Sequence, residues 1–228
     1  MLAKIDCFSQ YYQSDRFRLE LKLPKRPGFH HFRFQSFQEN RFIRIKDVVN
    51  CKEVLGNAIL KNTPKNVFFT PVKWLDPVNV RRRTDDRVND YMLSSPLYFD
   101  IDSDLSQGET WESAIEIAKR LILFLDDEQG RKPDWIVFSG RRGFHIYYWD
   151  WDEIPKESTS AESRIAAFRK SRIAIVEKLK KNGLIVDRLV TADPWRVLRV
   201  PGTLHGTTGL IAKVFANLED FSIGKTKP

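Results

Sequence analysis

The chain has few cysteines, no long apolar run and no repeated or low-complexity segment. Among its 228 residues the cysteines are Cys7 and Cys51, whose spacing matches neither a disulfide framework nor a zinc knuckle. We therefore expect no structural zinc and an intracellular, reducing location. The N-terminus lacks the apolar stretch of a signal peptide, and no run approaches the roughly 20 apolar residues that cross a bilayer. We expect no membrane partner.

The composition indicates a folded, basic protein. Hydrophobic residues make up 42% of the chain, which is enough to bury a core in one large domain or in two small ones tightly joined. Lys and Arg number 38 against 30 Asp and Glu, so the net charge is +8. This balance favours polyanionic partners without identifying one.

The segment from Leu97 to Asp102 is an apolar run that ends in two acids one residue apart, Asp100 and Asp102. On a β-strand, side chains alternate between faces, so the two carboxylates project together while Phe99 and Ile101 point into a core. Paired carboxylates repel one another and lose hydration on a packed sheet. A hard cation such as Mg²⁺ or Mn²⁺ removes that conflict. The alternative interpretation is a strand that simply ends before a turn at 103–108.

The first 90 residues predict a small α/β unit. Residues 4–23 favour a helix that Pro24 ends, strands are expected around Phe32–Phe34 and Phe42–Ile45, a helix over Val48–Lys61, and a strand over Asn66–Thr70. Arg81, Arg82 and Arg83 follow in a polar connector. Such a run is usually a solvated loop, and its other interpretation is a contact to a nucleic-acid backbone.

The rest of the chain predicts a second unit in the order strand, helix, strand, strand, helix, strand. The elements expected after Asp102 are a helix over 110–127, strands over 135–139 and 144–149, a helix over 159–183 that Thr159 and Glu162 cap, and a strand over 184–187. This order is that of the split βαβ, or RNA-recognition-motif-like, sheet, in which the first and third strands are central neighbours. The fold class is therefore α+β. The first strand would then lie beside His145, with Asp187 on an adjoining strand.

Three acids and a basic turn form one candidate site. Asp100, Asp102 and Asp187 provide the carboxylates that two-metal phosphoryl transfer requires. The turn around Ser139, which carries arginines and a histidine, can grip a triphosphate through guanidinium groups and backbone N–H groups. Further along, the segment 196–209 contributes more arginine, histidine and glycine residues.

Three motifs and a distal element resemble the archaeo-eukaryotic primase superfamily, in particular the small catalytic subunit and the primase-polymerases. They are Tyr98-Phe99-Asp100-Ile101-Asp102, Ser139-Gly140-Arg141-Arg142-Gly143-Phe144-His145, Val186-Asp187 and Arg199-Val200-Pro201-Gly202-Thr203-Leu204-His205-Gly206. The resemblance implies a nucleotidyltransferase that starts or extends chains on a DNA template from nucleoside triphosphates. It further implies that Asp100, Asp102 and Asp187 are catalytic ligands of Mg²⁺ or Mn²⁺. The implied nucleotide-binding residues are Ser139, Arg141, Arg142, His145, Arg199 and His205.

The resemblance has two departures and sets the expected partners. Replicative small subunits commonly have lysine two residues after the distal histidine, where this chain has Thr207, and many carry a zinc-binding knuckle that this chain lacks. The chain is thus more similar to a compact primase-polymerase. Residues 1–90 would pack on a catalytic core of residues 91–228. Expected partners are a single-stranded DNA template, nucleoside triphosphates and an accessory primase subunit, further domains or a helicase.

Two other functions remain open from the residues. A metal-dependent glycosyltransferase also places an Asp-x-Asp pair after an apolar strand to bind a nucleotide sugar. The basic net charge and the Arg141-Arg142 pair argue against it. A non-catalytic RNA-recognition-like module would need exposed aromatics in place of acids on its binding face. For the template surface we choose Arg81, Arg82 and Arg83, together with Arg33, Arg41 and Arg44.

Overall fold

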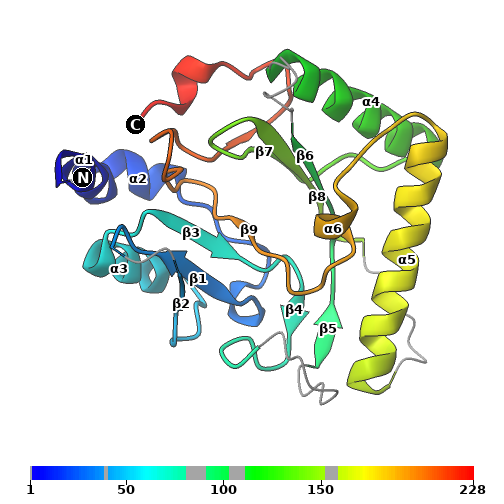
Figure 1. Ribbon diagram of the computed structural model, residues 1–228, viewed down its shortest axis with the longest axis horizontal. Coiled ribbons are helices and arrows are strands. Elements are labelled where there is room, and N and C mark those ends of the chain that lie inside the picture. The colour runs from blue at the N-terminus through cyan, green and yellow to red at the C-terminus, as the bar shows by residue number, and fades with distance from the viewer. Residues whose placement is uncertain (1, 39–40, 81–90, 103–110, 152–158) are drawn as a thin grey trace.

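Two four-stranded antiparallel sheets, each with helices packed against it, form the centre of the described part of the chain (Figure 1). This computed structural model describes all residues except 1, 39–40, 81–90, 103–110 and 152–158. The elements up to residue 90 are α1 (Leu2–Gln13), α2 (Asp15–Glu20), the 3₁₀ helix η1 (Pro27–Phe29), β1 (Phe32–Gln35), β2 (Phe42–Arg44), α3 (Lys52–Asn62), β3 (Asn66–Phe69) and β4 (Lys73–Trp74). Those that follow are β5 (Met92–Ser94), β6 (Leu97–Asp102), α4 (Trp111–Gln129), β7 (Trp135–Phe138), β8 (Gly143–Tyr148), α5 (Ala161–Lys181), α6 (Arg188–Thr191), β9 (Leu198–Arg199), β10 (Lys213–Phe215) and η3 (Ile223–Thr226).

The N-terminal sheet has the strand order β2-β1-β3-β9, and alternation along its strands separates two faces. Phe32 and Phe34 of β1 are buried in one core with residues of α1 and α3, as the alternating pattern predicts. The opposite face carries Arg33, which pairs across the strands with Arg44 of β2 and with Phe68 of β3. This second face therefore combines arginine and aromatic side chains.

The helix predicted over residues 4–23 is divided into α1 and α2. The division falls at Ser14, whose hydroxyl accepts a hydrogen bond from the backbone N–H of Phe17 and so caps the second helix. The predicted helix before the third strand is present as α3, which ends at Asn62; its C-cap, Thr63, adopts the left-handed conformation at φ 38°.

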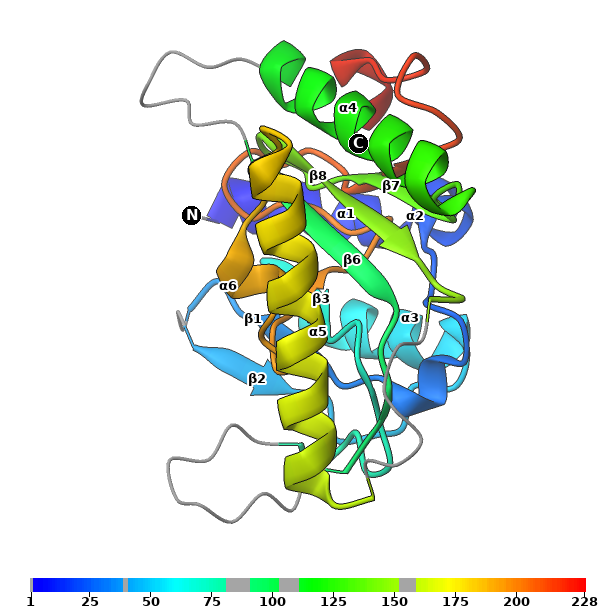
Figure 2. The same cartoon turned by 90° about the vertical axis from the view of Figure 1, so that its right-hand side faces the viewer.

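The second sheet has the strand order β10-β7-β8-β6 and buries one face under α4 and α5. Figure 2 shows α5 lying across this sheet, with β6 behind it. Phe99 and Ile101 of β6 join that core together with Phe144 and Ile146 of β8. The prediction that these residues face inward is confirmed. Asp100 must then project from the opposite face, toward the N-terminal sheet.

The cap of α5 differs from the prediction by one residue. Ser160, and not Thr159, is the N-cap: its hydroxyl accepts from the backbone N–H of Ser163 at 3.1 Å, and the hydroxyl of Ser163 accepts from the N–H of Ser160 at 3.1 Å. Glu162 therefore lies in the first turn and not at the capping position. Serine at both positions completes the reciprocal pair that glutamate was expected to complete.

The strand predicted over 184–187 is wrong. Leu184 and Val186 are buried in the core under α5, but only one backbone bond reaches β6 among the bonds of the described residues, from the N–H of Asp187 to the carbonyl of Asp100 at 3.3 Å. Asp187 then caps α6, which turns the chain away from the sheet. The fourth strand is β10, on the other edge beside β7. As a result β6 is an edge strand, although its predicted neighbour β8 is correct.

The C-terminal half returns to the N-terminal sheet through β9. Leu198 pairs with Phe69 and Arg199 pairs with Phe68, so β9 extends the sheet that β1 to β3 begin. The boundary expected near residue 90 lies outside the described residues. A bilayer crossing needs a long, apolar helix, and none of the described helices meets that requirement.

Candidate active site

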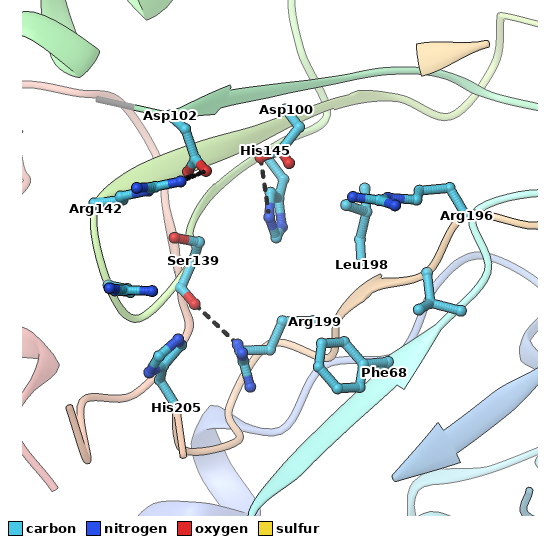
Figure 3. Close-up of a pocket in the computed structure, with 12 residues that line it drawn as sticks. Phe68, Asp100, Asp102, Ser139, Arg142, His145, Arg196, Leu198, Arg199 and His205 are labelled. Atoms are coloured by element: carbon cyan, nitrogen blue, oxygen red, sulfur yellow. Dashed lines mark hydrogen bonds and ion pairs between the residues drawn. The ribbon is translucent and has the colours of Figure 1, made fainter. Parts of the chain in front are cut away.

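A pocket of about 200 Å³ lies between the two sheets (Figure 3). Eight of the residues that the sequence predicts for the site line it: Asp100, Asp102, Ser139, Arg141, Arg142, His145, Arg199 and His205. They come from β6, from the β7–β8 turn and the start of β8, and from β9 and the segment after it. Three parts of the chain that are far apart in sequence therefore meet at one cavity.

The acid pair belongs to β6, and strand pairing fixes its surroundings. Asp100 lies directly opposite His145 on β8, and Asp102 lies opposite Gly143. Both carboxylates face the pocket, as alternation predicts. Arg142 pairs with Asp102, with 3.0 Å between Nη2 and Oδ2.

Asp100 sits in an environment that disfavours its charge. Burial, followed by the negative charges of Asp102 and Asp187, raises the pKa of its carboxyl to about 8. Oδ1 of Asp100 lies 3.4 Å from Nε2 of His145, without the geometry of a hydrogen bond, and it has no hydrogen-bond partner among the described residues. Burial also lowers the pKa of His145 to about 3. At neutral pH the two side chains thus meet as a protonated acid and a neutral imidazole.

A cation fits the acid pair. A buried carboxylate oxygen without a donor, beside a second carboxylate on the same face, is the environment that a hard divalent cation stabilises. Within the described ranges no three His, Cys, Asp or Glu side chains are gathered as a ready metal cluster. Mg²⁺ needs fewer protein ligands than that, because it is commonly held by one or two carboxylates and the phosphates of its substrate.

Asp187 lies near the acid pair but does not line the pocket. Its negative charge raises the pKa of Asp100, and its backbone N–H donates to the carbonyl of Asp100. Its carboxylate caps α6, where Oδ1 accepts from the backbone N–H groups of Leu189 at 2.7 Å and Val190 at 3.1 Å. One oxygen of this carboxylate is therefore committed to the helix.

Close approach at two points shapes the basic turn between β7 and β8. A Cβ on Gly143 would lie 2.0 Å from the carbonyl oxygen of Ile101 and 2.5 Å from Oδ1 of Asp102. Gly140 has φ 87°, and a Cβ there would lie 2.8 Å from Cβ of His205. Glycine at these positions lets the turn lie against both the acid strand and the distal segment.

Arg199 is an anchor of the pocket wall as well as part of its lining. It is buried, and its guanidinium donates to the carbonyl of Ser139 at 3.0 Å and to Oδ1 of Asn66 at 2.6 Å. It also lies over the ring of Phe68, at 4.9 Å from the ring centre. Burial lowers its pKa to about 10. These contacts join the two sheets across the pocket.

His205 presents one ring nitrogen to the backbone and the other to the pocket side. Its Nδ1 accepts from the N–H groups of Thr207 at 3.2 Å and Thr208 at 3.3 Å, so the neutral ring carries its proton on Nε2. Burial, followed by the charges of Arg199 and Arg141, lowers its pKa to about 3. His205 is thus a neutral donor at neutral pH.

Two more residues line the pocket, Phe68, which the sequence did not point to, and Arg196, which was predicted only as part of the basic segment 196–209. Arg196 is exposed and extends toward the acid pair from the segment before β9, across the pocket from Arg142 (Figure 3). Its positive charge acts to lower the pKa of Asp100. The spacing Arg196-x-x-Arg199 offered a signal, but nothing in the sequence indicated that both side chains reach one cavity. Arg81, Arg82 and Arg83 lie outside the described residues.

Comparison with known proteins places these features in a family. The family model described as the DNA primase small subunit matches residues 99–216, more than half of the chain. The DNA primase small subunit PriS of Saccharolobus solfataricus is 24% identical over 267 aligned residues, which cover 96% of this chain and 78% of that protein. PriS of Pyrobaculum calidifontis is 27% identical, with coverage of 91% and 76%.

A solved structure has the same fold. The polymerase domain of Mycobacterium tuberculosis ligase D, solved in complex with DNA, superposes with a TM-score of 0.62 at 15% identity, covering 98% of this chain and 86% of that one. The fold and the family match together define the class of a DNA primase-type nucleotidyltransferase. The chain belongs to the DNA primase small subunit family. The resemblance found in the sequence motifs is confirmed.

Proposed function

We propose that the protein is a DNA-template-dependent primase or primase-polymerase that joins nucleoside triphosphates at the pocket between its sheets. The observation that carries the proposal is one cavity of about 200 Å³ with two carboxylates on one wall and four arginines and two histidines around it. Carboxylates suit a cation, and arginine and histidine donors suit a triphosphate. The two sets of side chains together suit a triphosphate that arrives with its cation.

In the proposed mechanism the acidic residues of the pocket bind the cations and the basic residues bind the triphosphate. Asp100 and Asp102, with Asp187 as the third acid, would hold the Mg²⁺ or Mn²⁺ ions, which when bound lower the barrier to attack on the α-phosphate. Arg142 and Arg141 would pair with the phosphates of the incoming nucleotide. His205 would donate a hydrogen bond to them through Nε2, since its other nitrogen faces the backbone. Ser139, at the start of the β7–β8 turn, and His145, on β8, would help to position the nucleotide in the pocket.

The arginine anchor acts differently in this proposal. Because Arg199 is buried and bonded to Ser139 and Asn66, we assign it mainly to holding the distal segment against the turn. We assign to Arg196, whose side chain is exposed, the phosphate contact that the resemblance implies for Arg199. This assignment modifies the role that the family resemblance implies for Arg199.

Organisation and partners are part of the same proposal. We propose an RNA-recognition-motif type of sheet for residues 91–228, supported by the antiparallel pairing of β6 with β8 and by α4 and α5 on one face. Residues 1–90 would be the unit that packs against it. The partners would be a single-stranded DNA template and an accessory primase subunit or helicase, with Arg81, Arg82 and Arg83 contributing to DNA binding.

An incorporation assay tests this function against its alternatives. The purified protein is incubated with Mg²⁺ or Mn²⁺ and labelled nucleotides on a primed template, on an unprimed single strand and without DNA. We expect incorporation that requires DNA and is lost when Asp100 and Asp102 are both changed to Asn. Asp127→Asn, which removes an exposed carboxylate from α4, is the matched control. Transfer from a nucleotide sugar, or strand binding without incorporation, would favour the glycosyltransferase or the binding module instead.

A further inference from the structure

A second cavity adjoins the active-site pocket on the side of the N-terminal sheet. Its volume is about 630 Å³, and Phe68, Arg196 and Val197 line both cavities. Its other lining includes Arg33, Phe42, Arg44 and Trp195, and we call it the arginine–aromatic groove. A ligand in the groove would therefore be separated from the proposed nucleotide site by these three shared residues.

We propose that this groove binds an unpaired nucleotide of the single-stranded template, with its base on the aromatic rings and its phosphate on Arg33. The proposal rests on the function proposed above and adds to it where the template enters. Strand register explains the groove. Phe42 and Arg44 are two residues apart on β2, and Arg33 and Phe68 follow across the sheet, so all four side chains occupy the face that is turned away from the helices.

The aromatic part of the groove is a stacking surface. Phe42 is 47% exposed on the edge strand β2, and its ring meets that of Phe68 edge to face at 5.4 Å between centres. Trp195 forms another wall, held in place because it stacks on Trp74 at 5.9 Å. Any of the nucleic-acid bases can stack on such rings, which suits a template of any sequence.

The charged part of the groove suits an anion. Nε of Arg33 is buried and has no hydrogen-bond partner among the described residues. Arg44 lies directly across from it, and its guanidinium donates to the backbone carbonyls of Val78 and Val80, which fixes it in position. Two guanidinium groups held side by side repel: burial and then Arg44 lower the pKa of Arg33, and the charge of Asp193 opposes them in part. A phosphodiester oxygen would supply the missing acceptor and relieve the repulsion.

The same features favour a single strand over the other polyanions near the site. In a duplex the faces of the bases are covered, so only an unpaired strand can use the rings of Phe42 and Phe68. A second nucleoside triphosphate would arrive with a bound cation, and Asp193 is the one acid among the described lining residues. A strand needs no carboxylate and can continue directly into the shared wall.

Equilibrium binding of a fluorescent single-stranded oligonucleotide, in the absence of nucleotides, tests the proposal. Phe42→Ala should weaken binding by about 5- to 150-fold, the range for loss of one base–aromatic stack. Its control is Phe29→Ala, which removes a 39% exposed ring outside the groove and should have little effect. Arg33→Gln should reduce the slope of log affinity against log salt by about 0.7. Arg18→Gln, an exposed arginine of α2, is the charge control.

The nucleotide KM on a saturating primed template separates this inference from the proposed function. For Phe42→Ala the nucleotide KM should remain within about twofold of the wild-type value. Loss of a nucleotide contact worth about 1 kcal/mol would change KM by about fivefold. Equal strand affinity of Phe42→Ala and Phe29→Ala, with both variants folded, would overturn the groove. So would a raised nucleotide KM with unchanged strand binding. Phe42-dependent strand binding in a protein that incorporates no nucleotide would uphold the groove and refute the polymerase.

Discussion

Arg142 holds one oxygen of Asp102 with two of its N–H groups: Nε lies 3.2 Å and Nη2 lies 3.0 Å from Oδ2. The two residues belong to opposite classes of the proposed site, one a cation ligand and the other a phosphate ligand. Their pairing satisfies both charges when neither ligand is bound. Binding of a cation with its triphosphate would exchange this one pair for two, Asp102 with the cation and Arg142 with a phosphate.

Removal of Arg142 should therefore separate cation binding from nucleotide binding. We expect Arg142→Gln to bind Mn²⁺ alone about two- to fivefold more tightly, because it frees Asp102 from a partly exposed ion pair. The same variant should raise the nucleotide KM. Mn²⁺ binding is followed by electron paramagnetic resonance, and Arg141→Gln is the control for a charge lost from the same turn. Weaker Mn²⁺ binding in Arg142→Gln alone would contradict the exchange.

The buried carboxyl of Asp100 should make stability depend on pH. Its pKa rises from 3.8 to about 8 on folding, so between these values the unfolded chain releases a proton that the folded protein keeps. Stability from this group is therefore lost as pH rises from about 4 to 8. Asp100→Asn has no proton to release, so its gain in Tm over the wild type should grow from pH 5 to pH 8 in metal-free buffer. A difference in Tm that is the same at every pH would refute the shift.

The contact between the basic turn and the acid strand should tolerate no side chain at Gly143. A Cβ there would lie 2.0 Å from the carbonyl oxygen of Ile101, so β6 and β8 would have to separate. We expect Gly143→Ala to lower the free energy of unfolding by about 1–3 kcal/mol, the cost of overpacking a dense interior, and to abolish incorporation. Gly56→Ala is the control: it lies inside α3 with no atom within 4 Å of the new Cβ and should be neutral or slightly stabilising. Chemical denaturation measures both variants.

Arg196 and Arg199, three residues apart, should fail in different ways. Arg199→Ala removes the hydrogen bonds that the guanidinium donates to the carbonyl of Ser139 and to Oδ1 of Asn66. Because these bonds involve a charged group, we expect the free energy of unfolding to fall by about 3 kcal/mol or more. Arg196→Ala removes an exposed side chain and should keep the wild-type Tm while raising the nucleotide KM. Equal effects of the two substitutions on Tm would show that the division between anchor and phosphate contact is wrong.

Local pattern was enough to predict the acid face and its neighbour. Alternation fixed the directions of Asp100 and Phe99, and the order of elements put β8 next to β6, so the position of Asp100 opposite His145 followed. The strand predicted at 184–187 failed because apolar alternation reports burial and not strand pairing: Leu184 and Val186 are buried, yet Asp187 is used as a helix cap. Thr159 and Ser160 are adjacent, and both have a hydroxyl that can cap a helix, so the sequence pattern could not decide between them.

Long-range pairing was beyond the sequence pattern. Two residues, Leu198 and Arg199, form a strand only because β3 is beside them, and this pairing buries the guanidinium of Arg199. The groove beside the pocket has the same origin. Phe42, Arg33 and Phe68 lie on strands that the sequence predicts, but their common face acquires a wall only when Trp195 arrives from the other half of the chain. The roles of Arg81, Arg82 and Arg83 remain predictions.

Anomalous X-ray diffraction from crystals grown with Mn²⁺, a nucleoside triphosphate and a short template tests the central claim most directly. We expect an anomalous peak bonded to oxygens of Asp100 and Asp102 at about 2.0–2.2 Å, close to octahedral Mg²⁺-type distances. Phosphates should lie beside Arg142 and Nε2 of His205, with Arg142 no longer on Asp102. A triphosphate bound elsewhere, or no peak at saturating Mn²⁺ with Arg142 still paired to Asp102, would contradict the account.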